Sequence, residues 1–206
     1  MRSQLLLSLP FVLGACGPNP PQDALQAGWI VQHDDDSAAS ANGRFLLHSD
    51  GSMEIGQGPN ADVWSKVDAT GNYRLTVDVT HLDSGLHPHG AGILFGGRDR
   101  GQPTEHYSYF LVRGDRSFLV KMRRGDATEV LANWTEHDAL AAEDAQGVTR
   151  NRLSVEVTAS ETRFAVNGVE VHRLPRQGCP ADGALGYRLV HDLRVRFGKI
   201  EVEQLP

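Results

Sequence analysis

Apolar and polar residues alternate with a period of two through most of the chain from about residue 43 onward. The alternation is most regular in residues 73–80 and 151–157, where every second residue is apolar. This period is that of a β-strand with one buried face. Turns rich in glycine separate the alternating segments at intervals of roughly 8–12 residues, which is typical of a sandwich or a barrel. About a dozen strands are predicted, too many for one open sheet that neither curls nor splits.

Short turns join several of these segments and predict β-hairpins. The clearest turn is Asn167-Gly168, because both residue types tolerate the positive φ that a two-residue hairpin needs. A second hairpin is predicted around Asp50-Gly51, and a third joins strands at 107–113 and 117–124. The hairpins favour antiparallel pairing throughout, and the fold class is therefore predicted to be an all-β, two-sheet antiparallel sandwich.

Two segments depart from this simple pattern. The last strand is predicted over residues 193–202, with an irregularity at Gly198. Residues 135–145 are the one stretch whose apolar spacing favours a helix, of one or two turns. Helix is otherwise scarce.

The hairpin at 107–124 carries the candidate binding surface. If Phe110 and Phe118 point into the core, the pleat sends their sequence neighbours to the opposite face. An aromatic ring beside fixed cations suits a sugar, whose C–H groups pack on the ring while its hydroxyl or acidic groups meet the cations. The alternative is an ordinary solvated strand face. The residues predicted to share the exposed face are Tyr109, Arg113, Lys121 and Arg123.

Three further residues are weaker candidates for the same ligand: His89, Trp134 and Arg152. His87 and His89 stand two apart before a strand, so plain loop residues and a metal pair are both alternatives, but no third ligand follows at a motif spacing. Trp134 is interpreted more readily as a core residue than as a sugar platform. Because His87 and His89 lack a third ligand at a motif spacing, no metal site is predicted.

The first 26 residues predict export and lipid anchoring. Arg2, an apolar run and small residues form a signal peptide over 1–15 that is too short to span a bilayer. Leu13-Gly14-Ala15-Cys16 resembles a bacterial lipobox, which implies cleavage before Cys16 and its lipidation. A Pro-rich tether is predicted over 16–26, followed by one domain over 27–206. Gly17 after the cysteine lacks the Asp of a retention signal, which implies the outer membrane of the bacterial envelope.

Charge and cysteine content narrow the function further. The net charge of −6 argues against nonspecific nucleic-acid binding, which needs a basic surface. With Cys16 lipidated, Cys179 has no partner for a disulfide and is interpreted as an inert thiol. The acidic run 34–36 is predicted to be a solvated loop, with a calcium site as the alternative. No cofactor is expected.

Several strand and turn motifs together resemble a known family. The motifs are Gly90-Ala91-Gly92-Ile93-Leu94-Phe95-Gly96-Gly97, Tyr107-Ser108-Tyr109-Phe110-Leu111-Val112-Arg113, Phe118-Leu119-Val120-Lys121, Asn151-Arg152-Leu153 and Val166-Asn167-Gly168. With these motifs the chain looks like a concanavalin-A-like jelly roll of the bacterial branch that includes laminin-G-like and 3-keto-disaccharide hydrolase domains, over roughly residues 28–202. The resemblance implies two curved antiparallel sheets, of which the concave one carries any ligand.

Motifs for catalysis are missing from the sequence. Laminarinase-type members of this superfamily carry Glu-x-Asp-x-Glu on one strand, and no such triplet occurs here. No nucleophile elbow, Walker loop or dinucleotide fingerprint occurs either. We therefore expect a noncatalytic, lipid-anchored protein that binds a carbohydrate or a similar polar small molecule. A glycoside hydrolase of the 3-keto-disaccharide hydrolase type and a structural or adhesive envelope module remain as alternatives.

Overall fold

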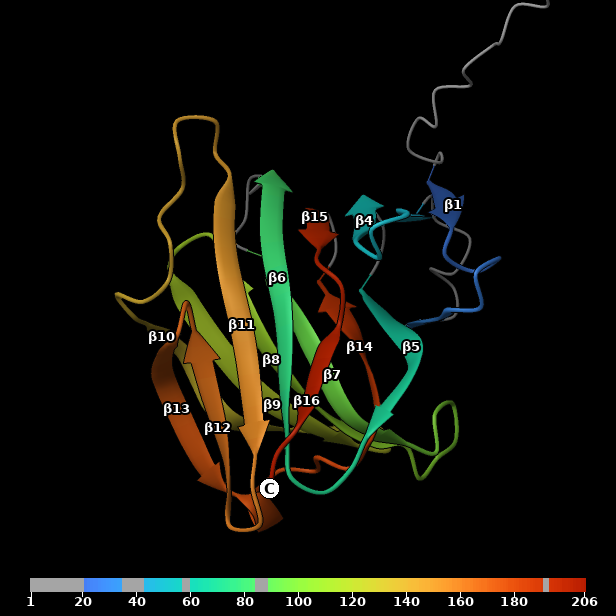
Figure 1. Ribbon diagram of the computed structural model, residues 1–206, viewed down its shortest axis with the longest axis vertical. Coiled ribbons are helices and arrows are strands. Elements are labelled where there is room, and N and C mark those ends of the chain that lie inside the picture. The colour runs from blue at the N-terminus through green and yellow to red at the C-terminus, as the bar shows by residue number, and fades with distance from the viewer. Residues whose placement is uncertain (1–20, 35–42, 57–59, 84–88, 191–192) are drawn as a thin grey trace, which may run out of the picture.

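The computed structural model describes residues 21–34, 43–56, 60–83, 89–190 and 193–206 of the 206-residue chain. These residues form two antiparallel sheets stacked face to face, without any α-helix in the described ranges (Figure 1). The predicted two-sheet sandwich is confirmed. The described ranges hold sixteen strands, where the sequence pattern predicted about a dozen.

The first sheet has nine strands in the order β1-β3-β4-β15-β6-β11-β12-β13, and β16 also pairs with β6. Its strands are β1 (Gln22–Asp23), β3 (Arg44–Leu47), β4 (Met53–Gly56), β6 (Tyr73–Asp83), β11 (Thr149–Val157), β12 (Glu161–Val166), β13 (Val169–Pro175), β15 (Arg194–Phe197) and β16 (Glu201–Gln204).

The second sheet has seven strands in the order β10-β9-β8-β7-β14-β5-β2. Its strands are β2 (Ile30–His33), β5 (Ala61–Ala69), β7 (Ala91–Arg98), β8 (His106–Arg113), β9 (Ser117–Arg124), β10 (Ala127–Glu136) and β14 (Gly183–Leu189). In Figure 1, β7, β8 and β9 of this sheet lie behind β6, β11 and β12 of the first sheet.

The three predicted hairpins are present with short connections: β3–β4, β8–β9 and β12–β13. In the last of these, Asn167 and Gly168 have φ values of 52° and 81°, the left-handed conformations that a two-residue hairpin turn requires. The three strand pairings predicted from the turn residues are therefore confirmed.

The core between the sheets contains the phenylalanines that the pleat argument placed inside. Phe110 is fully buried and Phe118 is 2% exposed. The ring of Phe110 lies 5.3 Å from that of Phe164 on the opposite sheet and 6.2 Å from that of Phe118, measured between centroids. The predicted inward face of the β8–β9 hairpin is confirmed, and its alternate residues therefore point outward.

The helix predicted over residues 135–145 is wrong. Strand β10 runs to Glu136, because it pairs with β9 as far as Ser117. After a series of turns, the Asp144 carboxylate accepts hydrogen bonds from the backbone N–H groups of Gln146 and Val148. An Asp side chain that bonds nearby backbone groups in this way stabilises a turn in place of a helix.

The predicted final strand is divided in two at Gly198. Strand β15 ends at Phe197, and β16 begins at Glu201 on another part of β6. The N–H of Gly198 donates to the carbonyl oxygen of Asp78 at 2.7 Å. A Cβ at position 198 would lie only 3.1 Å from Cβ of Asp78, so the close approach favours glycine.

Cys179 follows a short 3₁₀ turn, η2 (Arg176–Gly178), and is 2% exposed. Burial raises the pKa of its thiol to about 11, although the contact of its Sγ with Oγ of Ser108 at 3.2 Å acts in the opposite direction. A thiol with a raised pKa is a poor nucleophile at neutral pH. The environment of Cys179 is therefore that of the inert thiol that the sequence predicted.

The structure describes only part of the N-terminal region for which predictions were made. Cys16, the signal peptide and the first residues of the tether lie outside the described residues. Residues 22–26, which were assigned to the tether, belong to the sandwich, because β1 pairs with β3 and Ala24 is fully buried. Within the described ranges, no helix has the length and apolar character needed to cross a bilayer.

Burial of His81 on β6 should make the free energy of unfolding depend on pH. Burial lowers its pKa from an ordinary 6.5 to about 4. The unfolded chain takes up a proton at this site near pH 6.5, whereas the folded chain does so only near pH 4. Stability is therefore lost as the pH falls from 6.5 to 4, by about 3 kcal/mol from this residue. Urea unfolding of the wild type at pH 7 and 4.5, compared with His81→Asn, measures the difference. Equal losses in the two proteins would contradict the prediction.

Candidate functional site

A cavity of about 510 Å³ lies on the outer face of the second sheet, on the side away from the core. We refer to it as the Trp134 cavity. Five of the seven residues that the sequence nominated for ligand binding line it: His89, Tyr109, Arg113, Lys121 and Trp134. Asp34, Asn60, Thr128 and Arg188 complete its polar lining, and Leu111, Leu119 and Val190 are its apolar part.

The pleat of the β8–β9 hairpin brings these side chains together. Tyr109 on β8 pairs directly with Lys121 on β9, and Leu111 pairs with Leu119. Directly opposed residues on neighbouring strands place their side chains on the same face. Arg113 lies at the end of the same row, next to the turn. The face that the sequence predicted is thus the face that forms the cavity.

The structure reverses the roles that the sequence suggested for Tyr109, as the exposed aromatic surface, and for Trp134, as the covered aromatic residue. Tyr109 lies on the predicted face but is only 4% exposed, and the guanidinium of Arg188 lies 5.0 Å from its ring centroid. Tyr109 is therefore part of the covered floor. Trp134 is half-buried and stands in the wall, where Gly90 leaves room for its indole because a Cβ would come within 2.7 Å of it.

Arg113 and Trp134 form one wall of the cavity. The Arg113 guanidinium lies 4.1 Å from the centroid of the Trp134 ring, a cation–π contact. Its Nε donates to Oγ of Ser117 at 2.8 Å and is equally close to Oδ2 of Asp115. These contacts orient the guanidinium before any ligand arrives, and its two terminal nitrogens have no partner among the described residues.

The floor contains a buried ion-pair network that the sequence analysis missed. Arg188 on β14 is 7% exposed, and its Nη1 donates to Oδ1 of Asp62 at 2.6 Å. Its Nη2 donates to Oδ2 of Asp34, also at 2.6 Å. Asp62 is 1% exposed and also accepts a hydrogen bond from the hydroxyl of Tyr107. The network joins β5, β8 and β14 with Asp34, the residue after β2, in the floor of the Trp134 cavity.

Arg188 and Asp34 favour each other's charged forms. Burial alone would lower the pKa of Arg188, but the carboxylates of Asp62 and Asp34 keep that pKa well above its ordinary value. Burial alone would raise the pKa of Asp34, but Arg188 and Asn60 bring it below its ordinary value. Burial raises the pKa of Asp62, although Arg188 and the hydroxyl of Tyr107 act in the opposite direction. The pair of Arg188 and Asp34 therefore places fixed charges in the floor of the cavity.

A local sequence signal for this network does exist. Asp62 stands between Ala61 and Val63, and Arg188 stands between Tyr187 and Leu189, all of which are buried. A charged residue inside an apolar strand is almost never buried without a partner. What the sequence could not reveal is that these two strands are neighbours, since residues 62 and 188 are far apart along the chain.

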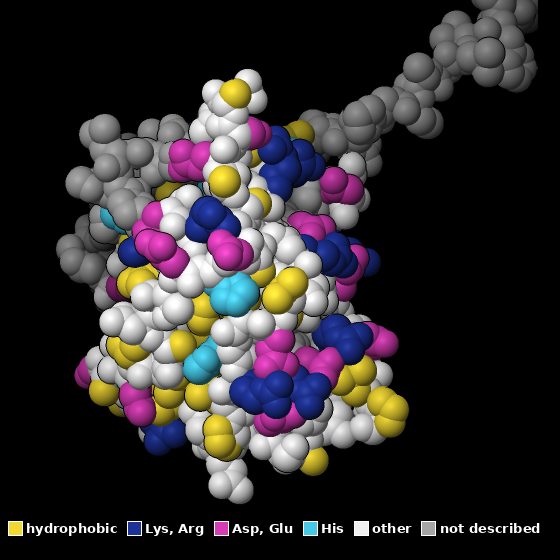
Figure 2. All heavy atoms as spheres, turned by 90° about the vertical axis from the view of Figure 1, so that its left-hand side faces the viewer, with side chains coloured by type: hydrophobic (Ala, Val, Ile, Leu, Met, Phe, Trp, Pro, Cys, Tyr) yellow, Lys and Arg dark blue, Asp and Glu magenta, His cyan; other side chains and the backbone are white. Residues whose placement is uncertain are grey.

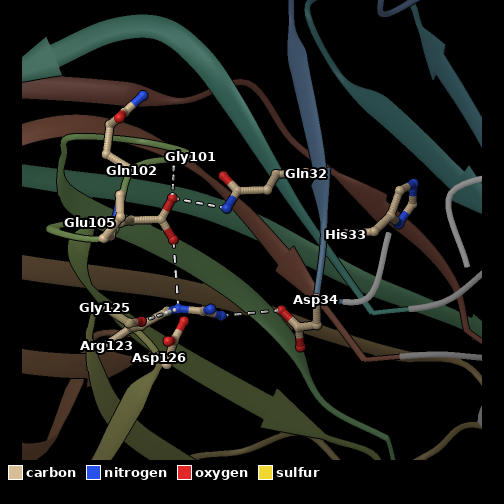
Figure 3. Close-up of a pocket in the computed structure, with 10 residues that line it drawn as sticks. Gln32, His33, Asp34, Gly101, Gln102, Glu105, Arg123, Gly125 and Asp126 are labelled. Atoms are coloured by element: carbon tan, nitrogen blue, oxygen red, sulfur yellow. Dashed lines mark hydrogen bonds and ion pairs between the residues drawn. The ribbon is translucent and has the colours of Figure 1, made fainter. Parts of the chain in front are cut away.

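A second cavity, of about 600 Å³, lies beside the first and contains the sixth predicted residue, Arg123. We call it the Glu105 cavity (Figure 3). Glu105 is 3% exposed, and its Oε2 accepts hydrogen bonds from Nε2 of Gln32 at 2.8 Å and from the N–H of Gly101 at 2.6 Å. Arg123 lies between the carboxylates of Glu105 and Asp34, at 3.6 and 3.7 Å.

Arg152 does not join the other six candidates. It lies on the outer face of the first sheet, on β11, where its guanidinium bonds Asp78 and Glu201 at 2.9 and 2.7 Å. Leu153 and Val155 point into the core, so the pleat turns Arg152 away from the second sheet. Acidic and basic side chains lie in mixed clusters on the side of the molecule seen in Figure 2. Arg152 itself is thus paired with two carboxylates of its own sheet.

The metal alternatives gain no support from the described residues. His87, Asp35 and Asp36 lie outside them, while His89 lines the Trp134 cavity and Asp34 is paired with Arg188. Within the ranges that the structure describes, no three His, Cys, Asp or Glu side chains are grouped so that they could hold a metal ion.

The fold and this site define a jelly-roll β-sandwich with a polar cavity on the outer face of one sheet. Residues 23–203 match the family model described as the 3-keto-alpha-glucoside-1,2-lyase-like domain, and the chain belongs to this family. The family resemblance noted from the strand and turn motifs is thereby confirmed. No curated protein sequence matches the chain.

Solved structures share the fold at low sequence identity. The carbohydrate-binding module CBM66 from Bacillus subtilis has a TM-score of 0.63 and 12% identity, covering 86% of this chain and 96% of its own. A galectin-like protein of unknown function from Bacillus subtilis has a TM-score of 0.61 and 12% identity, covering 91% and 97%. An endo-beta-1,3-glucanase from Pyrococcus furiosus has a TM-score of 0.61 and 9% identity, covering 85% and 88%. At these identities the similarity concerns the fold.

Proposed function

We propose that the Trp134 cavity binds a saccharide without transforming it. The observation that carries the proposal is the convergence of Trp134, Arg113 and Lys121 on one cavity above a floor of fixed charges. Its volume falls within the range of about 300–1,000 Å³ that is usual for small-molecule sites. One protein of similar fold is a carbohydrate-binding module, which supports the same class of ligand.

Sugar recognition needs an apolar surface together with oriented polar groups. Trp134, Leu111 and Leu119 supply the apolar surface, against which the C–H groups of a pyranose ring can pack. Arg113 and Lys121 supply donors for hydroxyl oxygens, and Asp34 supplies an acceptor. Because the guanidinium of Arg113 is already held in place, little of its conformational freedom is lost on binding.

The cellular setting belongs to the same proposal. The lipobox-like sequence ending at Cys16 would anchor the protein in the bacterial envelope, in the outer membrane, and the residues after it would hold the sandwich above the lipid surface. A glycan-binding cavity on such an anchored domain would capture polysaccharide at the cell surface. Globomycin-sensitive processing and labelling of Cys16 by a fatty-acid analogue would test the anchor.

A second candidate function is cleavage of a 3-keto-glucoside, which the family match over residues 23–203 favours. The carboxylates nearest the cavity are committed to other contacts: Asp34 binds Arg188, and Glu105 binds Gln32 and Gly101. This pairing favours binding over proton transfer. Incubation of the purified protein with 3-keto-glucosides, followed by chromatography for released sugar, distinguishes the two functions, because turnover would establish the enzyme.

Replacement of Trp134 by alanine tests the binding proposal. A glycan array first identifies the saccharide, and calorimetry then measures its Kd. We expect Trp134→Ala to weaken binding by about tenfold or more, the loss typical of a central aromatic residue. Val169→Ala is the matched control, since Val169 is 48% exposed and lies on β13 of the other sheet. Unchanged affinity in Trp134→Ala, or no glycan bound by the wild type, would contradict the proposal.

A further inference from the structure

The Trp134 cavity and the Glu105 cavity adjoin along strand β9. Asp34 lines both of them. Lys121 lines the first and Arg123 the second, and these two residues point to the same face because they are two apart on the strand. A chain of sugar units lying along β9 would therefore pass from one cavity to the other. This inference rests on the proposed saccharide binding and concerns the ligand's charge.

Most of the charged groups around the two cavities cancel in pairs. Arg113 is matched by Asp115, and Arg188 by Asp62. Arg123 lies between Asp34 and Glu105 (Figure 3). The charges that remain after this pairing decide how the site discriminates between charged and neutral ligands.

Lys121 is the basic group that remains in the Trp134 cavity. It is half-buried on β9 and makes no ion pair with any of the described residues. The carboxylate nearest to this cavity in the described ranges, that of Asp34, is already bonded to Arg188. An anionic group on a ligand would give Lys121 the ionic partner that the described residues do not provide.

The opposite charge remains at the other end. Asp126, just after β9, lines the Glu105 cavity and makes no ion pair with a described residue. Asp34 is bonded to Arg188 and Glu105 lies beside Arg123, so among the described residues that line this cavity the negative charge that remains is that of Asp126. An anionic sugar is therefore disfavoured here by charge repulsion, whereas a neutral sugar is accepted.

We propose that the ligand is an acidic oligosaccharide with a fixed direction, whose uronic-acid unit occupies the Trp134 cavity. Its carboxylate binds the ammonium of Lys121, and the terminal nitrogens of Arg113 are a second set of donors in the same cavity. The next sugar unit, which is uncharged, occupies the Glu105 cavity. A ligand of the reverse direction would place its carboxylate beside Asp126 and lose affinity.

The test compares glycans that differ only in the acid group. The full chain is screened on an array holding matched pairs of oligosaccharides that end in glucose or glucuronic acid, and in galactose or galacturonic acid. Calorimetry then gives the Kd of both members of the strongest pair at low and high salt. We expect the acidic member to bind about fivefold tighter at low salt, as for an ion pair that retains contact with water, and high salt to reduce this preference.

Three variants show whether the preference comes from Lys121. Lys121→Gln should bring the ratio of the two dissociation constants close to one. Lys199→Gln removes the same charge from an exposed position beside Gly51, on the other sheet, and should leave the ratio unchanged. Asp126→Asn should not reduce the preference for the acidic glycan. It should increase this preference where acidic ligands of the reverse direction bind more tightly once the carboxylate of Asp126 is removed.

The outcomes separate the two proposals. Equal affinity for acidic and neutral glycans, or a preference that survives Lys121→Gln, overturns the inference while saccharide binding stands. The absence of binding to every glycan on the array overturns the proposed function itself. A salt-sensitive acidic preference that disappears only in Lys121→Gln supports the inference.

Discussion

Replacement of Arg188 by methionine is expected to lower the free energy of unfolding by about 3–5 kcal/mol, because it leaves a buried carboxylate without its cation. Asp62 is 1% exposed, and its ionic partner among the described residues is Arg188, at 2.6 Å. Methionine fills a similar apolar volume, so the loss reflects charge more than packing. Urea denaturation at pH 7, monitored by tryptophan fluorescence, measures the effect.

Two controls distinguish the loss of a buried ion pair from the loss of a guanidinium group in general. Arg150→Met removes a more exposed guanidinium that pairs with Asp144, and it should leave the free energy of unfolding almost unchanged. The double variant Asp62→Asn, Arg188→Met should recover part of the lost stability, because no unpaired buried charge remains. A loss below about 1 kcal/mol in Arg188→Met would show that Asp62 is not held as an ion in the folded protein.

Replacement of Phe110 by alanine should lower the free energy of unfolding by about 3–5 kcal/mol, the usual cost of truncating a buried phenylalanine. Its ring is fully buried and packs between Phe118 on its own sheet and Phe164 on the other. The cavity left behind would separate the two sheets where they pack. Chemical denaturation measured for Phe110→Ala and the wild type determines the loss.

The matched control for the stability of this variant is Val130→Ala, on an edge strand and 52% exposed. Surface truncations of this kind usually change stability by less than about 0.5 kcal/mol. If Phe110→Ala were as stable as Val130→Ala, the inward face of β8 would be assigned incorrectly. The outward face, with Arg113 and Lys121, would then be misplaced as well.

The sequence predicted those features of the fold that depend on neighbouring residues. The turn at Asn167-Gly168 and the direction of Phe110 follow from local conformational preference and from the two-residue period of a strand. Because the period leaves only two choices of face, correct placement of one phenylalanine also placed Tyr109, Arg113 and Lys121 on the cavity side.

The features that the sequence did not predict depend on which strands become neighbours. Arg152 was grouped with the binding face, but its strand β11 joins the first sheet through β6. The Asp62–Arg188 pair forms because β5 lies beside β14. Residues 135–145 show a different failure: pairing with β9 and the hydrogen bonds of Asp144 prevailed over helical spacing.

The buried network positions the polar groups at the boundary between the two cavities. Arg188 connects Asp62 in the floor with Asp34 at this boundary. Arg123 then connects Asp34 with Glu105. Through these contacts Asp34 and Arg123, which line the cavities, are held by buried partners, as a selective binding site requires.

The most direct test of saccharide binding is a crystal structure of the protein with the tightest-binding oligosaccharide from the array. We expect a sugar ring in the Trp134 cavity, packed against Trp134 and within hydrogen-bonding distance of Arg113 or Lys121. A sugar bound instead on the outer face of the first sheet, near Arg152, with the Trp134 cavity unoccupied, would contradict it.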